Sequence, residues 1–168
     1  MGATRPDPPC FLDNTNRYFD CGNGTVTDTV TGLLWLTDAA CLLGANWATA
    51  NQAAADLKDG DCGLTDHSSP GDWRLPTKDE WSATLAHAVA LGCTGGTAPS
   101  LTNDAGTGCL SVGPTSFAGV TSFGYWSSTT KEINPGVAWG AVLGNGNVVN
   151  TLVKFIPFRV WPVRGGPR

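Results

Sequence analysis

The sequence is poor in the residue types that build zinc sites, helical bundles and membrane spans. Only 14% of its residues are charged, methionine occurs once, and the two histidines are His67 and His87. No two cysteines are spaced as C-x-x-C, so the common ligand pattern of a zinc site is missing. No apolar run approaches the length that spans a bilayer, and we expect no membrane insertion. What remains, with 22 glycines and 7 tryptophans, is typical of one domain rich in loops and strands.

Charge is distributed unevenly along the chain. The net charge of −4 argues against general nucleic-acid binding. Residues 1–130 hold five basic and thirteen acidic side chains, whereas residues 131–168 hold five basic side chains and one acidic side chain. We therefore expect a weakly basic face in the C-terminal part of the chain, which could meet an acidic partner.

The cysteines are even in number and widely spaced, which is typical of a disulfide framework formed in an oxidising compartment. The six residues are Cys10, Cys21, Cys41, Cys62, Cys93 and Cys109. Six cysteines allow fifteen pairings. We favour the sequential pairing, because each bridge then closes a short polar or glycine-rich loop and contributes on the order of 3 kcal/mol. No leader is visible after Met1, and we expect that an export leader has been lost.

A helix is predicted to start in the segment 71–81, which reads Gly-Asp-Trp-Arg-Leu-Pro-Thr-Lys-Asp-Glu-Trp. Pro76 ends an extended stretch. Thr77 and Glu80 have the spacing of a capping box, in which each side chain bonds a free N–H of the other residue. The helix should run from about residue 78 to residue 91 and end at Gly92.

The same segment suggests how that helix is held to the core. The predicted buried face consists of Trp81, Leu85, Ala88 and Val89. Arg74 and Asp72 could bind a ligand, but we interpret them as an ion pair that pins the helix.

The remaining pattern predicts an α+β domain over residues 17–168, preceded by an extended, proline-rich arm over residues 1–16. A first helix is expected over 47–57, capped by Asn46, with a buried stripe of Trp47, Ala50, Ala54 and Leu57. Two short strands are expected around 25–27 and 33–35, next to a hairpin turn at 23–24. Further strands are expected at 125–130, at 137–143, from 148 onward and at 159–164, with Pro162 placing the last of these at an edge or bulge.

Two loops contain residues that could carry chemistry. Asp66, His67 and Ser68 resemble a catalytic trio on paper, but neighbours in sequence rarely converge on one substrate atom, and we interpret them as a surface loop. The long segment 93–123 contains Asn103 and Asp104, whose oxygens could bind calcium. Because the alternating ligand spacing of a calcium loop is missing, we expect no cofactor, and calcium stays a minor alternative.

Six blocks of the sequence resemble, in order, the DUF1566 family, the domain found at the C-terminus of the Legionella collagen-like adhesin. The blocks are Gly-Asn-Gly-Thr-Val-Thr-Asp-Thr-Val-Thr-Gly-Leu-Leu-Trp (22–35), Gly-Asp-Trp-Arg-Leu-Pro-Thr (71–77), Tyr-Trp-Ser-Ser-Thr-Thr (125–130), Ala-Trp (138–139), Asn-Gly-Asn-Val (145–148) and Val-Trp-Pro-Val-Arg-Gly-Gly (160–166). This resemblance implies a C-type-lectin-like fold, with two helices flanking a small twisted antiparallel sheet and long loops pinned by disulfides.

The resemblance does not imply a catalytic set. The Arg-Leu-Pro-Thr piece is similar to the helix start of formylglycine-generating enzymes, which use a copper-binding cysteine pair near the C-terminus. This chain has no cysteine after Cys109, and we expect no enzyme activity. The Glu-Pro-Asn and Trp-Asn-Asp motifs of calcium-dependent lectins are also missing.

The resemblance to an adhesin domain favours an exported, secreted or cell-surface binding module for glycans, sulfated polysaccharides among them. The candidate ligand-binding residues are Lys131, Asn134, Trp139, Asn145, Asn147, Asn150, Lys154 and Arg159. For Trp126 and Trp139 core packing is the competing interpretation, and for the lysines and asparagines it is a solvated hairpin surface. Two other functions stay open: a structural subunit or tip of an extracellular filament that self-associates, and a diversified receptor for a surface protein ligand.

Overall fold

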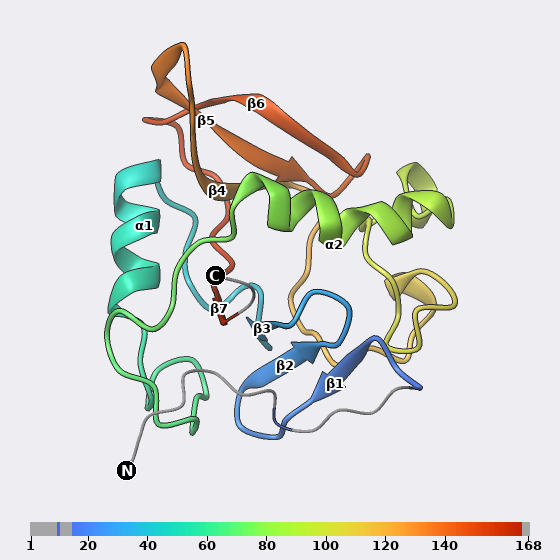
Figure 1. Cartoon of the computed structure of the whole chain (residues 1–168). Coiled ribbons are helices and arrows are strands. Elements are labelled where there is room, and N and C mark those ends of the chain that lie inside the picture. The colour runs from blue at the N-terminus through green and yellow to red at the C-terminus, as the bar shows by residue number, and fades with distance from the viewer. Residues whose placement is uncertain (1–9, 11–14, 166–168) are drawn as a thin grey trace.

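The computed structural model describes residue 10 and residues 15–165, so most of the predicted arm 1–16 lies outside the described residues. Seven strands, two α-helices and two short 3-10 turns follow one another in these ranges (Figure 1). The α-helices are α1 (Trp47–Asp56) and α2 (Lys78–Ala90). The strands are β1 (Tyr18–Asp20), β2 (Thr25–Asp28), β3 (Leu33–Leu36), β4 (Gly124–Lys131), β5 (Asn134–Val142), β6 (Asn147–Val153) and β7 (Val163–Gly165). The chain is an α+β protein, as predicted.

The strands form two small antiparallel sheets, where the family resemblance implied one. The first, which we call the lower sheet, has the order β1-β2-β3-β7, and the second, the upper sheet, has the order β4-β5-β6. The predicted hairpin turn at 23–24 joins β1 to β2, and β1 is a third strand beside the two expected ones. β7 lies at the edge of its sheet, directly after Pro162, which lacks the N–H that a central strand needs.

Both helices begin at the predicted caps. Asn46 Oδ1 accepts a hydrogen bond from the backbone N–H of Thr49. Thr77 and Glu80 form the full capping box, and Asp79 and Glu80 lie at the positive end of the helix dipole. In Figure 1, α2 crosses the molecule between the two sheets, so one face of the helix is positioned to pack on both.

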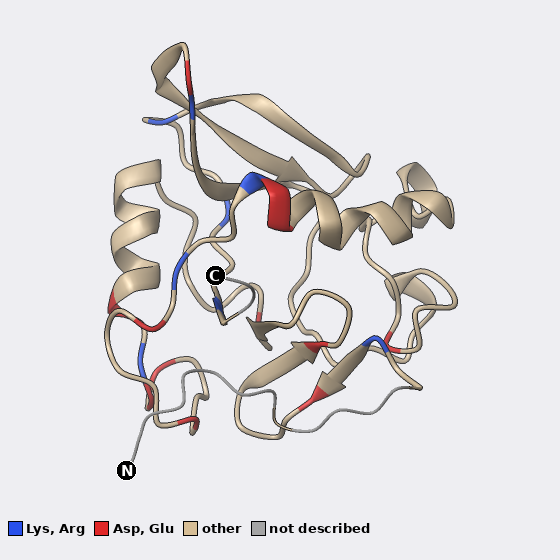
Figure 2. Cartoon of the chain, in the orientation of Figure 1, with Lys and Arg blue, Asp and Glu red and all other residues tan. Residues whose placement is uncertain are grey.

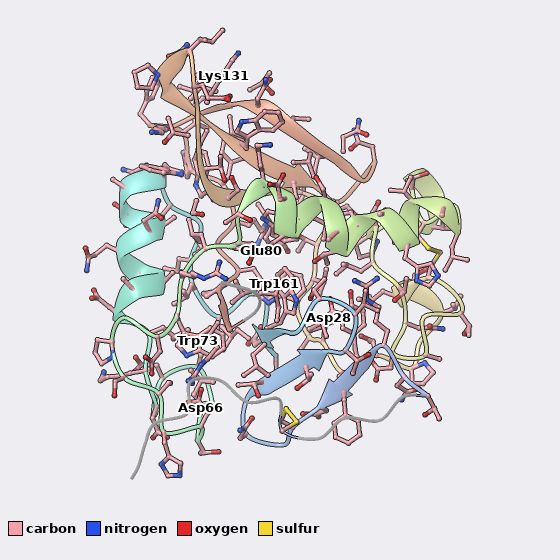
Figure 3. All side chains as sticks on the ribbon, viewed as in Figure 1. Asp28, Asp66, Trp73, Glu80, Lys131 and Trp161 are labelled. Carbon is pink, nitrogen blue, oxygen red and sulfur yellow. A yellow bond between two sulfur atoms is a disulfide. The ribbon has the colours of Figure 1, made fainter. Side chains whose placement is uncertain are left out.

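An aromatic cluster fills the space between α2 and the sheets. The ring of Trp161 lies 4.7 Å from that of Trp35 and 5.0 Å from that of Phe117, and the ring of Trp81 lies 5.2 Å from that of Trp35. The indole N–H of Trp161 donates to the carbonyl of Leu36 at 2.7 Å, so burial leaves no unpaired donor there. The labelled Trp161 lies at the centre of the molecule in Figure 3.

Trp126 is buried, as predicted, on the opposite face of the upper sheet, where α1 packs. Its indole N–H donates to the carbonyl of Ala45 at 2.7 Å. The predicted stripe of α1 is confirmed for Ala50, Ala54 and Leu57, which are buried, whereas Trp47 is only half-buried.

Two expectations about α2 are wrong. Arg74 pairs with Glu80, not with Asp72: its guanidinium donates to both carboxylate oxygens, at 2.7 and 2.8 Å. Asp72 instead accepts a bond from the backbone N–H of Ser69 and lies 3.8 Å from Arg164. Val89, predicted to be buried, is 42% exposed, because the turn around Gly146 rather than a sheet face lies beside it.

The three disulfides pair sequentially, as predicted: Cys10–Cys21, Cys41–Cys62 and Cys93–Cys109. The second bridge joins the segments before and after α1, and the third closes part of the long segment 93–123. Asn103 and Asp104 pin that segment further, since their side chains accept bonds from the backbone N–H groups of Thr107 and Ser116. These oxygens, considered for calcium, are engaged within the loop itself.

Candidate functional site

The eight candidate residues lie on or beside the upper sheet, but the structure does not bring them into one site. Three of them, Lys131, Asn134 and Lys154, lie toward the β4–β5 hairpin, at the end of the sheet where Figure 3 labels Lys131. Two others, Asn145 and Asn147, lie at the β5–β6 turn, which is at the opposite end of the same strands. Trp139 and Asn150 lie between these ends, and Arg159 lies beside the outer edge of β4.

At the hairpin end, the side chains of Lys154 and Asn134 make contacts within the fold. The ammonium of Lys154 lies 3.8 Å from the centre of the Trp47 ring and donates to Thr130 Oγ1 at 2.8 Å. Asn134 pairs with Lys131 in the strand register, and its side chain accepts a bond from the N–H of Gly136. This end combines a stacked lysine with a turn-forming asparagine.

The β5–β6 turn uses its asparagines in the same way. Asn145 Oδ1 accepts a hydrogen bond from the backbone N–H of Asn147 at 3.0 Å, which is the local side-chain bond that favours asparagine in turns.

Arg159, beside the outer edge of β4, places its guanidinium 5.1 Å from the centre of the Phe123 ring. Phe123 is 63% exposed, so this pair is accessible from solvent.

The middle of the sheet holds the most distinctive polar arrangement. Trp139 is half-buried on β5, on the face that also carries Ala141 and packs toward α2. The ammonium of Lys78, the first residue of α2, lies 4.9 Å from the centre of the Trp139 ring. The backbone N–H of Lys78 donates to Thr129 Oγ1 at 3.1 Å, which fixes the helix start against β4. We call Trp139 and Lys78 the tryptophan–lysine pair.

A β-bulge shapes the neighbourhood of Trp139. Gly140 pairs with Val149 and Ala138 pairs with Leu152, so two residues of β6, Asn150 and Thr151, face the single residue Trp139. Bulges redirect side chains and are frequent near functional sites. The indole nitrogen of Trp139 is buried and has no hydrogen-bond partner within the described part of the chain.

An open groove of about 640 Å³ runs along the same face, between α2 and β6. Its lining is mainly apolar and carries no charged side chain: Ser82, Leu85, Ala86, Val89, Gly146, Asn147, Val148 and Val149. A volume of this order is typical of a ligand-sized cleft. One candidate residue, Asn147, therefore lines a cleft.

The charges reinforce this picture. In Figure 2 the basic segments of the upper sheet lie apart from the acidic turns that follow α1. Lys131 and Lys154 belong to the upper sheet and its end, whereas Asp56, Asp59 and Asp61 lie at the far end of α1. The basic C-terminal part expected from the sequence is thus only partly a feature of the upper sheet, because Arg164 lies in β7 of the lower sheet and pairs with Asp66.

The residues considered for catalysis hold the fold together. Ser68 Oγ donates to Asp66 at 2.7 Å and accepts from the indole of Trp73, while Asp66 is held by Arg164 at 2.8 Å. His67 is exposed and bonds through its backbone N–H to Asp59. Across residues 10 and 15–165, no three histidine, cysteine or acidic side chains gather to hold a metal ion.

Sequence reasoning missed two parts of this site. Lys78 was assigned only to a helix start, because nothing in the sequence relates it to Trp139, 61 positions away. The groove was missed because it depends on how α2 crosses the upper sheet. The exposed position of Val89 on a predicted buried face is a consequence of that crossing.

The comparisons with known proteins give one match. The model of the family described as the Lcl C-terminal domain matches residues 24–164, which is most of the chain. No curated protein and no solved structure matches the chain significantly. Within the described ranges, no helix has the length and apolar character needed to cross a membrane.

Proposed function

The chain belongs to the Lcl C-terminal domain family, and from that premise we propose that it is an exported, adhesin-like binding module that recognises glycans through the α2-facing side of its upper sheet. The single observation that carries the proposal is the tryptophan–lysine pair. A half-buried indole with an ammonium at 4.9 Å offers an apolar platform and a hydrogen-bond donor side by side.

Neighbouring groups suit a polyhydroxylated ligand. Asn150 and Thr151 lie opposite Trp139 in the strand register, at the bulge, and Asn147 lines the groove. Such amides and hydroxyls both donate and accept hydrogen bonds, as sugar hydroxyls require. Lys131, farther along β4, supplies a second cation for a sulfated or carboxylated glycan.

Other features of the structure support the proposed compartment and mode of action. Three disulfides support export to an oxidising compartment. The structural use of Asp66 and Ser68 supports action by binding rather than by catalysis. We extend the proposal to a C-type-lectin-like arrangement, supported by two helices that flank small antiparallel sheets and by the long, disulfide-pinned segment 93–123.

The test is a glycan array with neutral, carboxylated and sulfated members, probed with the oxidised protein at low and high salt. We expect binding to a subset of glycans. For anionic members we expect binding to weaken as salt rises, because exposed charges separated by more than a Debye length are screened. The Lys78→Gln variant should lose part of this binding, whereas Lys58→Gln, which removes an exposed lysine paired with Asp61, should not. An array without any glycan signal would contradict the proposal and favour a protein ligand.

A further inference from the structure

Three of the four sheet edges are covered by other parts of the chain. The β1 edge is bonded at its start, where the N–H groups of Arg17 and Tyr18 donate to the carbonyl of Asp104. At the β7 edge, Val163 and Arg74 exchange two backbone hydrogen bonds. At the β4 edge, the N–H of Trp126 donates to the carbonyl of Arg159.

The fourth edge, β6, is open. In the part of the chain that the structure describes, the backbone of β6 bonds to β5 and otherwise makes only two local turn bonds, from Asn147 to the side chain of Asn145 and from Ile156 to Val153. Directly after the strand, the carbonyl of Lys154 accepts a bond from the N–H of Trp47. In Figure 1, β6 is the outermost strand of the upper sheet. An open edge presents a row of unpaired N–H and C=O groups and is a template for another strand.

The usual protection of such an edge is weak here. Natural edge strands carry lysine, other charges or proline. β6 has none of these, and the whole stretch 133–153 contains no charged side chain. Its one protective device is the bulge at Asn150 and Thr151. Apolar surface lies alongside: Val89 is 42% exposed on the α2 side of the groove, with Val148 and Val149 on the β6 side.

We propose that the β6 edge pairs with β6 of a second copy of this chain. An interface between identical copies about a two-fold axis brings the residues next to the axis near their own counterparts, so a charge at its centre would meet a like charge. The neutral stretch 133–153 meets this requirement, and it distinguishes a second copy from a charged partner. Antiparallel pairing would extend the upper sheet from three to six strands and cover the exposed Val89 of both copies.

The pairing places the exposed Thr151 of both copies near the centre of the interface, because Asn150 is the midpoint of β6. The test therefore introduces charge at this position. Sedimentation velocity of the full oxidised chain over a wide concentration range should show a monomer–dimer equilibrium for the wild type. The Thr151→Lys and Thr151→Glu variants should each shift toward monomer by tenfold or more in dissociation constant. An equimolar mixture of the two variants should recover the dimer, since opposite charges then meet.

The matched control is Thr107→Lys, which adds the same charge at an exposed threonine in the long loop. It should leave the dimer unchanged. Amide hydrogen exchange of β6 should slow with protein concentration in the wild type and in the Thr107→Lys control, but not in either Thr151 variant alone. A wild type that stays monomeric at its highest soluble concentration would overturn the proposal, as would a dimer that Thr151→Lys leaves intact. These measurements contain no glycan, and the array tests glycan recognition separately.

Discussion

Arg74 and Glu80 face each other at the start of α2 and are joined by two parallel hydrogen bonds of 2.7 and 2.8 Å. The same guanidinium donates to the carbonyl of Gly165 at 3.0 Å, and Glu80 also accepts from the N–H of Thr77. One carboxylate thus connects the helix cap to the last strand. Bidentate arginine–carboxylate pairs are among the stronger polar contacts in proteins.

Replacing Glu80 with glutamine should make the free energy of unfolding less dependent on pH in the acidic range. Burial opposes ionisation of Glu80, but the hydrogen bonds from Arg74 and Thr77 outweigh it and lower its pKa. The contribution of Glu80 is therefore complete above the ordinary glutamate pKa of about 4.3 and is lost as the pH falls through the lowered value. We expect Glu80→Gln to unfold at lower urea concentration at pH 7 and to show a flatter fall in stability below about pH 5. If the free energy of unfolding fell with pH equally steeply in the wild type and in Glu80→Gln, this role of Glu80 would be contradicted.

The buried pair of Arg17 and Asp28 should be the most sensitive electrostatic contact. The atoms Nη2 and Oδ2 lie 3.0 Å apart, and the side chains are 4% and 0% exposed. Burial disfavours the charged arginine, but the neighbouring Tyr18 and Asp28 outweigh it and raise the pKa of Arg17. Removing one partner leaves the other charge buried and unpaired, so Asp28→Ala should cost about 3–5 kcal/mol.

The measurement for this pair is the free energy of unfolding in urea. Asp79→Ala removes a carboxylate that is largely exposed and should cost much less, since exposed ion pairs contribute little. Equal losses of unfolding free energy in Asp28→Ala and Asp79→Ala would show that the buried Arg17–Asp28 pair contributes no more to stability than an exposed pair.

The disulfides should account for a large share of stability. Removing the Cys93–Cys109 bridge by a double substitution to serine frees a loop with a sequence separation of 16, which should cost about 3 kcal/mol. The Cys10–Cys21 bridge, with a separation of 11, should cost somewhat less. Thermal unfolding of the two double variants, with and without reductant, checks the order. A reduced wild type that is as stable as the oxidised protein would contradict the stabilising role of the disulfides.

Gly140 should be intolerant of a side chain although its backbone is ordinary β-strand. A methyl group there would meet the carbonyl oxygen of Tyr125 at 2.6 Å and collide with the Leu152 side chain. Overpacking of this kind typically costs about 1–3 kcal/mol, and we expect Gly140→Ala to reach that range in urea denaturation. Gly96→Ala, where a methyl group meets nothing within 4 Å, should change stability little. A neutral Gly140→Ala variant would show that β5 and β6 can separate locally.

Local sequence signals predicted the elements well, because their causes are local. The capping box of Thr77 and Glu80 fixed the start of α2, and the short loops between neighbouring cysteines indicated the disulfide pairing. The division into two sheets depends on which strands meet across long sequence separations, as in the pairing of Leu34 with Arg164. Periodicity within a strand does not determine its partner.

The candidate site was predicted less completely for the same reason. Trp139 was identified from its motif, but its partner Lys78 comes from another element. The asparagines at 134 and 145 fit their hairpins, and the structure shows them bonding their own turns. A turn-forming asparagine and a ligand-binding asparagine have the same sequence appearance.

Glycan recognition at the tryptophan–lysine pair is tested most directly by calorimetric titration of the strongest glycan from the array. Wild type, Trp139→Ala and the control Phe155→Ala should be compared, since Phe155 is an aromatic residue 81% exposed at the far end of β6. We predict that Trp139→Ala weakens binding at least tenfold, or about 1.4 kcal/mol, and that Phe155→Ala leaves it unchanged. Equal affinities for wild type and Trp139→Ala would contradict the assignment of this face as the binding site.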